Sequence, residues 1–391
     1  MLKLCFNPQK ILKFSKGFLL PMSVFGIFLV YFFSVSEFSE KTYHLLHILF
    51  LCCLAITLLG TAFLKITSIF ISTSIIYICY LIINSMRYAY GEDYMFSAGY
   101  NIWSILVWPN LFFAYILFQK KMQYKRWSWF YIALFAQTAL IEKLQSSALN
   151  TDSFYFYKHV GMLNYPALVL SVIFLFYLLI EQMSKGKILN AAALFSSAAV
   201  FCGLYFSDNL FAFILFFLAA VTIELVSALY YAYYNYYRDE EVDIANTKQF
   251  FKEANKKYPL KYSIVLMYID EYENLLKRFG IKKMFALKKM FVNRIHKVKP
   301  TALIYNYKAD SLVLAFKNAN TSESFEDAEN IRRLLAKSIF VFNENNHLQL
   351  TVSQCVSEKK RSDFGAQTVL SRAEKTLKKA CKFTRNITVK A

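Results

Sequence analysis

The stretch "LIYNYKADSLVLAF" (Leu303–Phe316) decides how the C-terminal half of the chain folds. Two short apolar runs flank the polar segment "YKADS", and this pattern predicts a strand, a tight turn and a second strand. The turn is atypical because it contains no Gly, Asn or Pro, the residues that supply special backbone angles in most tight turns. The stretch therefore predicts a β-hairpin with an unusual tip.

Composition divides the chain into two halves. Of its 391 residues 57% are hydrophobic, too large a share for a soluble protein of this length. Up to about Tyr237, long runs such as Gly17–Val35 and Phe211–Ile223 carry almost no charge, and after that charged residues occur every few positions. We therefore predict three regions. They are a multi-span membrane region at 1–232, a linking helix with an entry motif at 233–257, and a soluble domain at 258–391.

The first half contains eight apolar stretches of about the length that a membrane-spanning helix needs, roughly 20 residues. They lie at about 17–36, 43–64, 66–86, 102–119, 127–145, 164–183, 188–207 and 209–232. With the N-terminus inside, the inner segments hold eleven Lys and Arg and the outer loops four, a bias that predicts this orientation. An even number of spans returns the C-terminal domain to the cytoplasm. We expect a membrane protein with its N-terminus and its C-terminal domain in the cytoplasm.

Two features near the end of the membrane half are candidates for sensing and for transmission. Glu224 lies inside the last span, where a charge is costly and usually marks function. Its place toward the cytoplasmic end leaves an interfacial carboxylate as the alternative. Beyond the tyrosine-rich stretch Ala228–Asp243, the pattern predicts a helix that continues to Lys256, either as a signal-transmitting rod or as a plain tether.

Charge indicates what the soluble half could bind. From Arg238 onward there are 30 Lys and Arg against 17 Asp and Glu, a net charge near +13. A basic cytoplasmic face near anionic lipid explains this excess, and an acidic partner or a nucleotide is the alternative. Nucleic acid is not expected because the Lys residues are scattered rather than concentrated with aromatic residues. The seven Cys show no CxxC pair and no metal spacing with the five His, so no cofactor is expected.

The soluble half alternates between strand-like and helix-like runs. The apolar run Tyr262–Asp270 predicts a buried strand. Lys282–Val298 predicts an amphipathic helix on which Met284 and Phe291 share one apolar stripe. After the hairpin come a helix, a strand and a last helix, at Ser324–Phe342, His347–Ser357 and Gly365–Phe383. The order β-α-β-β-α-β-α predicts an α+β domain with a ferredoxin-like, palm-type sheet covered by helices.

Four segments of this half match the motifs of one known family, in order and in spacing. Asp239–Phe250 is similar to the entry motif D-x-L-T-G-L-x-N-R-R-x-F, and Tyr268–Gly280 to D-I-D-x-F-K-x-I-N-D-x-Y-G. Leu350–Val356 is similar to the strand I-T-x-S-x-G, and Ala373–Asn386 to A-D-x-A-L-Y-x-A-K-x-x-G-R-N. Over about Asp239–Val389 the chain thus resembles the GGDEF domain, the fold of diguanylate cyclases. In that family the hairpin turn carries the Gly-Gly-Asp/Glu-Glu-Phe signature, and here it reads Lys308, Ala309, Asp310, Ser311 and Leu312.

The resemblance implies a reaction for which this sequence is poorly equipped. Joining two GTP molecules into cyclic di-GMP needs divalent metal ions, here Mg²⁺, held by carboxylates. Of the two metal carboxylates that the family implies, Asp310 is kept and the other position is Tyr268, whose phenol is a poor ligand at neutral pH. Lys308 and Ala309 replace the two glycines, which allow backbone N–H groups to approach phosphates closely.

The nucleotide contacts that the resemblance implies are mostly missing as well. The guanine-reading positions hold Leu276 and Phe285, one phosphate position holds Cys381, and the other keeps Arg385. Arg385 and Lys308 are therefore the remaining candidates for phosphate binding. The inhibitory site of the family would fall at 299–302, which reads "KPTA", so cyclic di-GMP is not expected to bind there in the family's way.

From the sequence we expect a membrane-anchored signalling protein with a degenerate, catalytically inactive GGDEF domain. Such a pseudoenzyme would act in cyclic di-GMP-type signalling by protein–protein contact or ligand-linked regulation, as a homodimer or as a heterodimer with another signalling protein. The alternative is a divergent diguanylate cyclase that uses Mg²⁺ to make cyclic di-GMP from two GTP. Binding of GTP or cyclic di-GMP has no support from the site residues. A nucleotide-binding module of altered specificity and a transporter with a regulatory tail are further alternatives, the latter without the intramembrane polar pairs it needs.

Overall fold

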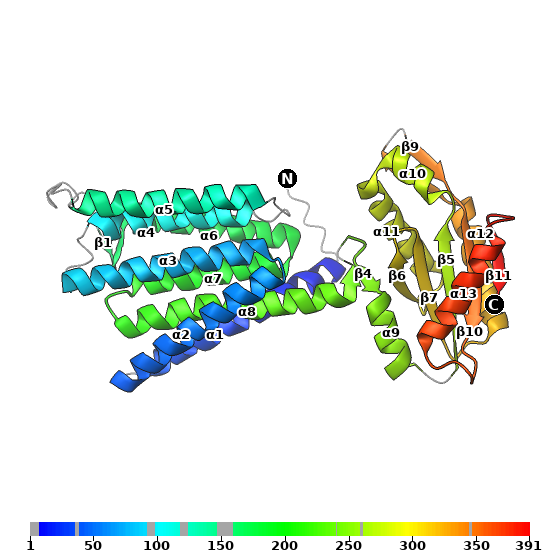
Figure 1. The fold of residues 1–391 in the computed structure, drawn as a ribbon, viewed down its shortest axis with the longest axis horizontal. Helices are drawn as coiled ribbons and strands as arrows, with labels where there is room; N and C mark the ends of the chain where they lie inside the picture. The colour runs from blue at the N-terminus through cyan, green and yellow to red at the C-terminus, as the bar shows by residue number, and fades with distance from the viewer. Residues whose placement is uncertain are drawn as a thin grey trace. The chain divides into compact units, whose positions relative to one another are not determined.

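The computed structural model describes residues 8–35, 39–91, 98–117, 124–146, 159–239, 241–258, 261–343 and 346–391 (Figure 1). The chain divides into two compact units, Met1–Ala232 and Tyr233–Ala391. Each unit has a hydrophobic core of its own. The two units are therefore described one after the other.

The N-terminal unit is a helical bundle. Its helices are α1 (Pro8–Ser34), α2 (Glu40–Phe63), α3 (Thr67–Tyr90), α4 (Ala98–Leu117), α5 (Tyr124–Ser146), α6 (Tyr165–Lys185), α7 (Ile188–Tyr205) and α8 (Leu210–Tyr237), with a two-stranded β1–β2 pair (His159–Val160 and Leu163–Asn164) before α6. Within the described residues, six of these helices are long and apolar enough to cross a membrane: α1, α2, α3, α6, α7 and α8. Eight spans were expected, and six helices of sufficient length and apolarity are found among the described residues. The span predicted at 102–119 reaches beyond the described residues, and α5 contains a shorter apolar segment, Ser128–Leu140.

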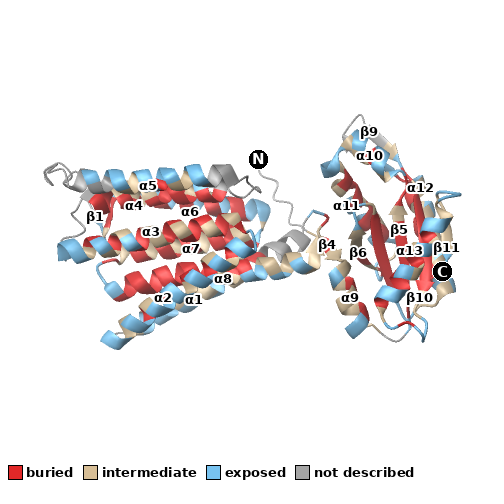
Figure 2. Cartoon of the chain, in the orientation of Figure 1, coloured by how far each residue is buried: buried red, intermediate tan, exposed pale blue. Residues whose placement is uncertain are grey.

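Of the six long apolar helices in the described residues, α8 is the most deeply buried. Of its most apolar stretch 78% is buried within the unit, compared with 11% for α1 (Figure 2). The ring of Phe213 stacks on that of Tyr80 from α3, with 5.2 Å between the ring centroids. On α7, a Cβ added at Gly203 would lie 2.9 Å from the ring of Phe217, so glycine lets α7 and α8 pack closely. Continuous apolarity thus places α8 inside the bundle.

The C-terminal unit is built on a seven-stranded sheet with the strand order β11-β10-β5-β7-β6-β4-β3. The strands are β3 (Arg238–Asp239), β4 (Ile244–Asn246), β5 (Tyr262–Ile269), β6 (Leu303–Lys308), β7 (Ser311–Lys317), β10 (Val352–Glu358) and β11 (Thr388–Lys390). The central strand β5 pairs antiparallel with both β7 and β10. The predicted order of strands and helices around this centre is confirmed, so the unit is an α+β domain of the expected type.

Helices cover both faces of the sheet. They are α9 (Thr247–Lys256), α10 (Tyr272–Phe279), α11 (Ile281–Val298), α12 (Thr321–Lys337) and α13 (Ala366–Ala380). Alternate residues of β5 enter different cores: Val265 and Met267 pack with α11 and α12, whereas Ile264 and Leu266 pack with α9 and α13 (Figure 1). A strand covered on both faces has no reason to alternate between apolar and polar residues, which explains the continuous apolar run of β5.

The predicted continuous helix to Lys256 is wrong. α8 ends at Tyr237, the short strands β3 and β4 follow, and α9 begins only at Thr247. The carboxylate of Asp239 accepts hydrogen bonds from the backbone N–H groups of Glu241 and Val242, both at 3.0 Å. Asn246 then caps α9 through its side chain. Asp and Asn favour such local hydrogen bonds over a continuous helix.

The predicted boundaries after the hairpin also need correction. The helix expected to reach Phe342 ends at Lys337, because the following run forms β8 (Ile339–Asn343), which pairs antiparallel with β9 (Asn346–Gln349). The strand expected at His347–Ser357 is accordingly split between β9 and β10. Phe340 is buried and packs against Phe291 of α11, with 4.8 Å between ring centroids. β-Branched and aromatic residues at 339–341 favour this strand.

Candidate functional site

The predicted hairpin is confirmed, and its turn needs no glycine. β6 ends at Lys308 and β7 begins at Ser311, so that Ala309 and Asp310 form the turn. Neither turn residue has a positive φ. The pairing register shifts between Asn306 and Lys308, and a bulge at this point adds the twist that a hairpin with an ordinary turn requires.

Asp310 and Tyr268, the two positions of the implied metal site, lie at neighbouring strand ends. Tyr268 of β5 is paired in register with Ser311 of β7. The backbone carbonyl of Asp310 accepts the N–H of Ile269 at 3.0 Å, and its carboxylate accepts the Ser311 hydroxyl at 3.0 Å. Burial, followed by the charges of Glu374 and Asp310, raises the pKa of Tyr268 well above its ordinary value. The phenol therefore stays protonated and unsuited to a metal ion.

On the face of the sheet covered by α13, Glu374 holds the hairpin tip. Its Oε2 accepts a hydrogen bond from the Tyr307 hydroxyl at 2.7 Å, and its Oε1 lies 2.5 Å from Lys308 Nζ and 3.0 Å from Lys378 Nζ. Tyr268 adds a longer contact to Oε1, at 3.4 Å. Burial opposes charge on Glu374, but the hydrogen bonds from Lys308, Tyr307 and Lys378 outweigh it and lower the pKa of this carboxyl to about 2. Lys308 is thus already ion-paired.

On the opposite face, the buried side chain of Lys288 from α11 reaches the same tip. Its ammonium group donates hydrogen bonds to Asn306 Oδ1 at 2.7 Å and to the backbone carbonyl of Lys308, and it lies 3.4 Å from the carbonyl of Ser311. The Lys288 side chain is 1% exposed. The hairpin tip is therefore held from both faces, by an ammonium on one side and a carboxylate on the other.

Lys288 is also linked to the start of the unit. Asn306, which accepts from Lys288, donates through Nδ2 to Asp239 Oδ2 at 2.6 Å. Burial lowers the pKa of Lys288 to about 8, although the charges of Asp239 and Asp310 oppose this effect. The sequence held one signal for this residue that was missed: Lys288 lies four residues after Met284 and three before Phe291, on the apolar stripe of α11.

The other predicted nucleotide contacts are also engaged or packed away. Arg385 forms an ion pair with Glu271, at 2.7 Å. Cys381 packs at the edge of the core beneath α13, and Leu276 and Phe285 pack against the core beneath α11. Both predicted phosphate-binding residues, Lys308 and Arg385, thus have carboxylate partners.

The fit of the implied Mg²⁺ site can be judged from its donors. Hard divalent cations prefer several oxygen ligands, carboxylates above all. Here the second carboxylate position is the protonated phenol of Tyr268, and Asp310 is hydrogen-bonded to Ser311. Among the residues that the structure describes, no group of three or more His, Cys, Asp or Glu side chains stands close enough to hold a metal ion. The donor set at the hairpin does not fit the implied two-metal site.

In the membrane half, the side chain of the predicted candidate Glu224 is fully buried among its own helices. Its Oε1 accepts hydrogen bonds from the hydroxyls of Ser72 at 2.6 Å and Tyr115 at 2.9 Å, and lies 3.4 Å from Ser196 Oγ. Thr73 donates to Oε2. These five residues, from α3, α4, α7 and α8, are called the Glu224 cluster below.

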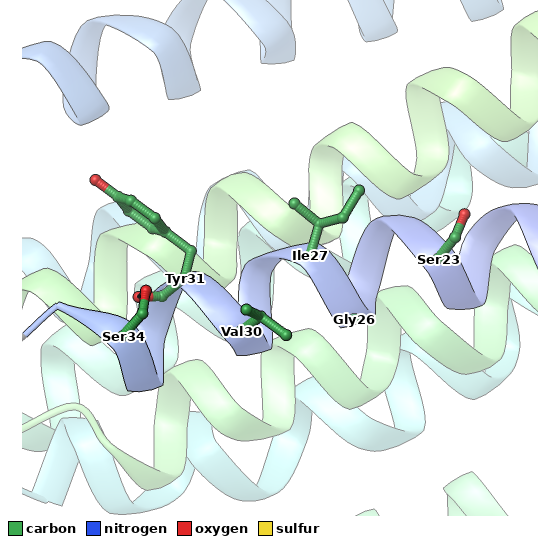
Figure 3. Close-up of a pocket in the computed structure, with 6 residues that line it drawn as sticks. All are labelled: Ser23, Gly26, Ile27, Val30, Tyr31 and Ser34. Atoms are coloured by element: carbon green, nitrogen blue, oxygen red, sulfur yellow. Dashed lines mark hydrogen bonds between the residues drawn. The ribbon is translucent and has the colours of Figure 1, made fainter.

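A shallow groove of about 500 Å³ runs along α1, far from these residues in sequence (Figure 3). It is lined by Ser23, Gly26, Ile27, Val30, Tyr31 and Ser34. The hydroxyls of Ser23 and Ser34 donate to carbonyls of their own helix. The groove therefore presents mainly apolar surface and shares no residue with the sites described above.

No protein-family model and no curated protein matches the chain. Solved structures similar to its C-terminal part include the GGDEF domain of FimX from Pseudomonas aeruginosa, 14% identical, with 40% of this chain and 99% of that one covered and a TM-score of 0.36. The GGDEF domain of DgcB from Caulobacter crescentus is 18% identical over 39% and 95% of the two chains, with a TM-score of 0.36. The active GGEEF domain of a diguanylate cyclase from Vibrio cholerae is 18% identical over 38% and 97%, with a TM-score of 0.34. All three of these structures are described as GGDEF or GGEEF domains.

Proposed function

We propose that the chain is a membrane-anchored signalling protein whose GGDEF-like domain acts by protein–protein contact and makes no cyclic di-GMP. One observation carries this proposal: the hairpin tip is bound from one face by Glu374 and from the other by Lys288. The side chain and the backbone carbonyl of Lys308, at the position where a nucleotide would bind, are thereby bonded to other groups of the protein. The domain keeps the shape of a signalling module without a vacant phosphate site at its hairpin.

The electrostatics of the tip support this proposal. A triphosphate would compete with Glu374 for Lys308 and would have to do so beside two acidic side chains, Glu374 and Asp310. Without a pair of metal carboxylates, its charge would stay uncompensated. The side chains of Lys308 and Ala309 also occupy space that glycines would leave free for a phosphate.

A divergent diguanylate cyclase is the second candidate. It is favoured by Asp310, which lies beside the end of β5 as a metal-binding carboxylate would, and by the exposed Arg385. This candidate requires Mg²⁺ and a second carboxylate supplied by a conformational change or by another subunit.

The proposal includes a location and a state of assembly. Six apolar helices support membrane association, and the excess of Lys and Arg in the inner loops supports a cytoplasmic N-terminus and C-terminal domain in a bacterial inner membrane. Assembly as a homodimer, or as a heterodimer with another signalling protein, would let the catalytically silent domain act on an active one. Mass measurement of the full chain in lipid nanodiscs distinguishes a monomer from a homodimer.

The test of the activity uses the full chain in nanodiscs with Mg²⁺. We expect isothermal titration with GTP and with cyclic di-GMP to give no heat of binding, and chromatography to detect no cyclic di-GMP. Glu374→Gln is the matched variant, because it removes the carboxylate that pairs with Lys308 while Lys288 still binds the tip from the other face. Turnover of GTP by the wild-type chain that Asp310→Ala abolishes would overturn the proposal in favour of the second candidate.

A further inference from the structure

The Glu224 cluster presents a problem of charge. An ionised carboxylate buried in a membrane protein is costly unless it has a cationic partner. Among the described residues, no Lys, Arg or His contacts Glu224, and Tyr115 is the one titratable group that does. The guanidinium of Arg87 on α3 lies over the ring of Phe213, about three helical turns away along α8. The carboxyl group must therefore be satisfied by neutral hydroxyls.

The hydroxyls of the cluster have a choice of acceptors. Ser72 Oγ lies 2.6 Å from Glu224 Oε1 and also 3.0 Å from the carbonyl of Ile69. Ser196 Oγ lies 3.4 Å from Glu224 Oε1 and 3.3 Å from the carbonyl of Ala193. Because each hydroxyl has a single hydrogen, it can donate to the carboxylate or to its own helix, but not to both at once.

This choice lets the cluster accommodate two protonation states. When the carboxyl group is charged, the hydroxyls turn toward it and donate. When it is neutral, Ser72 and Ser196 can donate to their backbone carbonyls, and the carboxyl O–H donates to a hydroxyl oxygen that is then free to accept. The change requires rotation of hydroxyl groups and leaves no buried polar atom of the cluster without a partner.

The geometry favours a proton over a metal ion as the ligand. A metal ion needs its oxygen ligands to face a common centre. Here the hydroxyls instead contact the carboxylate oxygens directly, at 2.6 Å from Ser72 and 2.9 Å from Tyr115. The cluster is closed by its own hydrogen bonds, so the ligand it can take without opening is a proton.

We propose that Glu224 is a reversible proton-binding site of the membrane half, whose protonation redirects the hydroxyls of Ser72 and Ser196 from the carboxylate to their own helices. This inference stands independently of the function proposed for the C-terminal half. Since the cluster joins α3, α4 and α7 to α8, binding of a proton changes the hydrogen bonds that hold the interior helix in the bundle. α8 continues from Glu224 to Tyr237, where the C-terminal unit has begun.

The test is infrared difference spectroscopy on the full chain in lipid nanodiscs, from about pH 5 to about pH 9, a range that covers the titration of buried Glu residues. We expect the carbonyl band of a protonated carboxylic acid to grow as the pH falls, to be absent from Glu224→Gln and to persist in Glu40→Gln, which removes an exposed carboxylate. A band that Glu224→Gln removes but that does not change with pH overturns the proposal, as does the absence of any such band.

A second variant keeps the inference testable even where Glu224→Gln fails to fold. Ser72→Ala retains the carboxyl group but removes a donor to its charged form, so the midpoint of the band's titration should move to higher pH by about one unit. Cys79→Ser, on the same helix, is the control that leaves the cluster's donors in place. An unchanged midpoint in Ser72→Ala would show that the hydroxyls do not respond to the proton.

Discussion

Replacing Lys288 by Met tests whether a buried ammonium holds the hairpin tip. In the folded protein burial lowers the pKa of Lys288 to about 8, from an ordinary value of 10.5. The unfolded chain therefore binds this proton more tightly than the folded chain does. The resulting loss of stability is fully present below about pH 8 and disappears as the pH rises toward about 10.5.

The magnitude follows from the same two values. Between about pH 7 and about pH 9, proton linkage at Lys288 adds about 1.3 kcal/mol to the free energy of unfolding of the wild type. Lys288→Met lacks this gain, because its side chain has a similar length and no charge. At neutral pH the two proteins should differ by no more than about 1 kcal/mol, since removing a buried charge and leaving three acceptors without a donor act in opposite directions.

The assay is urea unfolding of the fragment Tyr233–Ala391, followed by circular dichroism at both pH values. Lys289→Met is the matched control because Lys289 is the neighbouring exposed residue of α11. We expect the stability difference between wild type and Lys288→Met to change by about 1.3 kcal/mol in favour of the wild type as the pH rises. Equal pH dependence in wild type, Lys288→Met and Lys289→Met would refute the reasoning.

Three further predictions use the same fragment. Glu374→Gln should cost about 1 kcal/mol at neutral pH, a loss that fades as the pH falls through about 2, because the folded-state pKa of Glu374 lies below its ordinary value; urea unfolding at two pH values measures it. Asp270→Ala leaves the hydroxyls of Thr351 and Ser353 without the carboxylate that accepts from them, while the N–H of Asn386 keeps Ser353 Oγ as an acceptor; it should cost about 2–4 kcal/mol, seen as a lower Tm. A Tm equal to that of the wild type would contradict it. Asn246→Ala removes the cap of α9 and should cost about 1 kcal/mol, with faster amide exchange confined to its first turn.

The parts of the fold that could be predicted are those that depend on residues close together in the sequence. The hairpin at β6–β7 is a short-range structure whose two apolar runs are adjacent in sequence, and β5 is a continuous apolar run because both its faces are covered. The break after α8 escaped prediction because it depends on one side chain, that of Asp239, which bonds to its neighbours' N–H groups. The tyrosines and charged residues around Asp239 are compatible with a helix, so the sequence pattern did not predict that the helix ends there.

The candidate site was less predictable because its partners are distant in sequence. Motif matching identified Asp310 and Tyr268, but Glu374 lies 66 residues from Lys308, and its contacts exist only after α13 packs on the sheet. Lys288 is compatible with a helix, so the sequence pattern does not single it out. Its hydrogen-bond acceptors are set by the position of the end of β6. In the membrane half Glu224 was identified by its charge alone, whereas Ser72 is 152 residues away and carries no signal of its own.

The short strands between α8 and α9 determine what kind of motion can pass from helix to sheet. β4 joins the sheet through two residue pairs with β6, and β3 joins β4 through two more. So small a ladder is marginal by itself, and β4 is held in addition by Ile244, which is buried in the core beneath α11 and α12. A continuous helix would link α8 to α9 rigidly, but here the backbone leaves the helical path at Tyr237 and returns to it only at Thr247. Rotation of α8 about its own axis therefore has no continuous helix through which to reach α9, and any coupling between them passes through the paired strands β3 and β4.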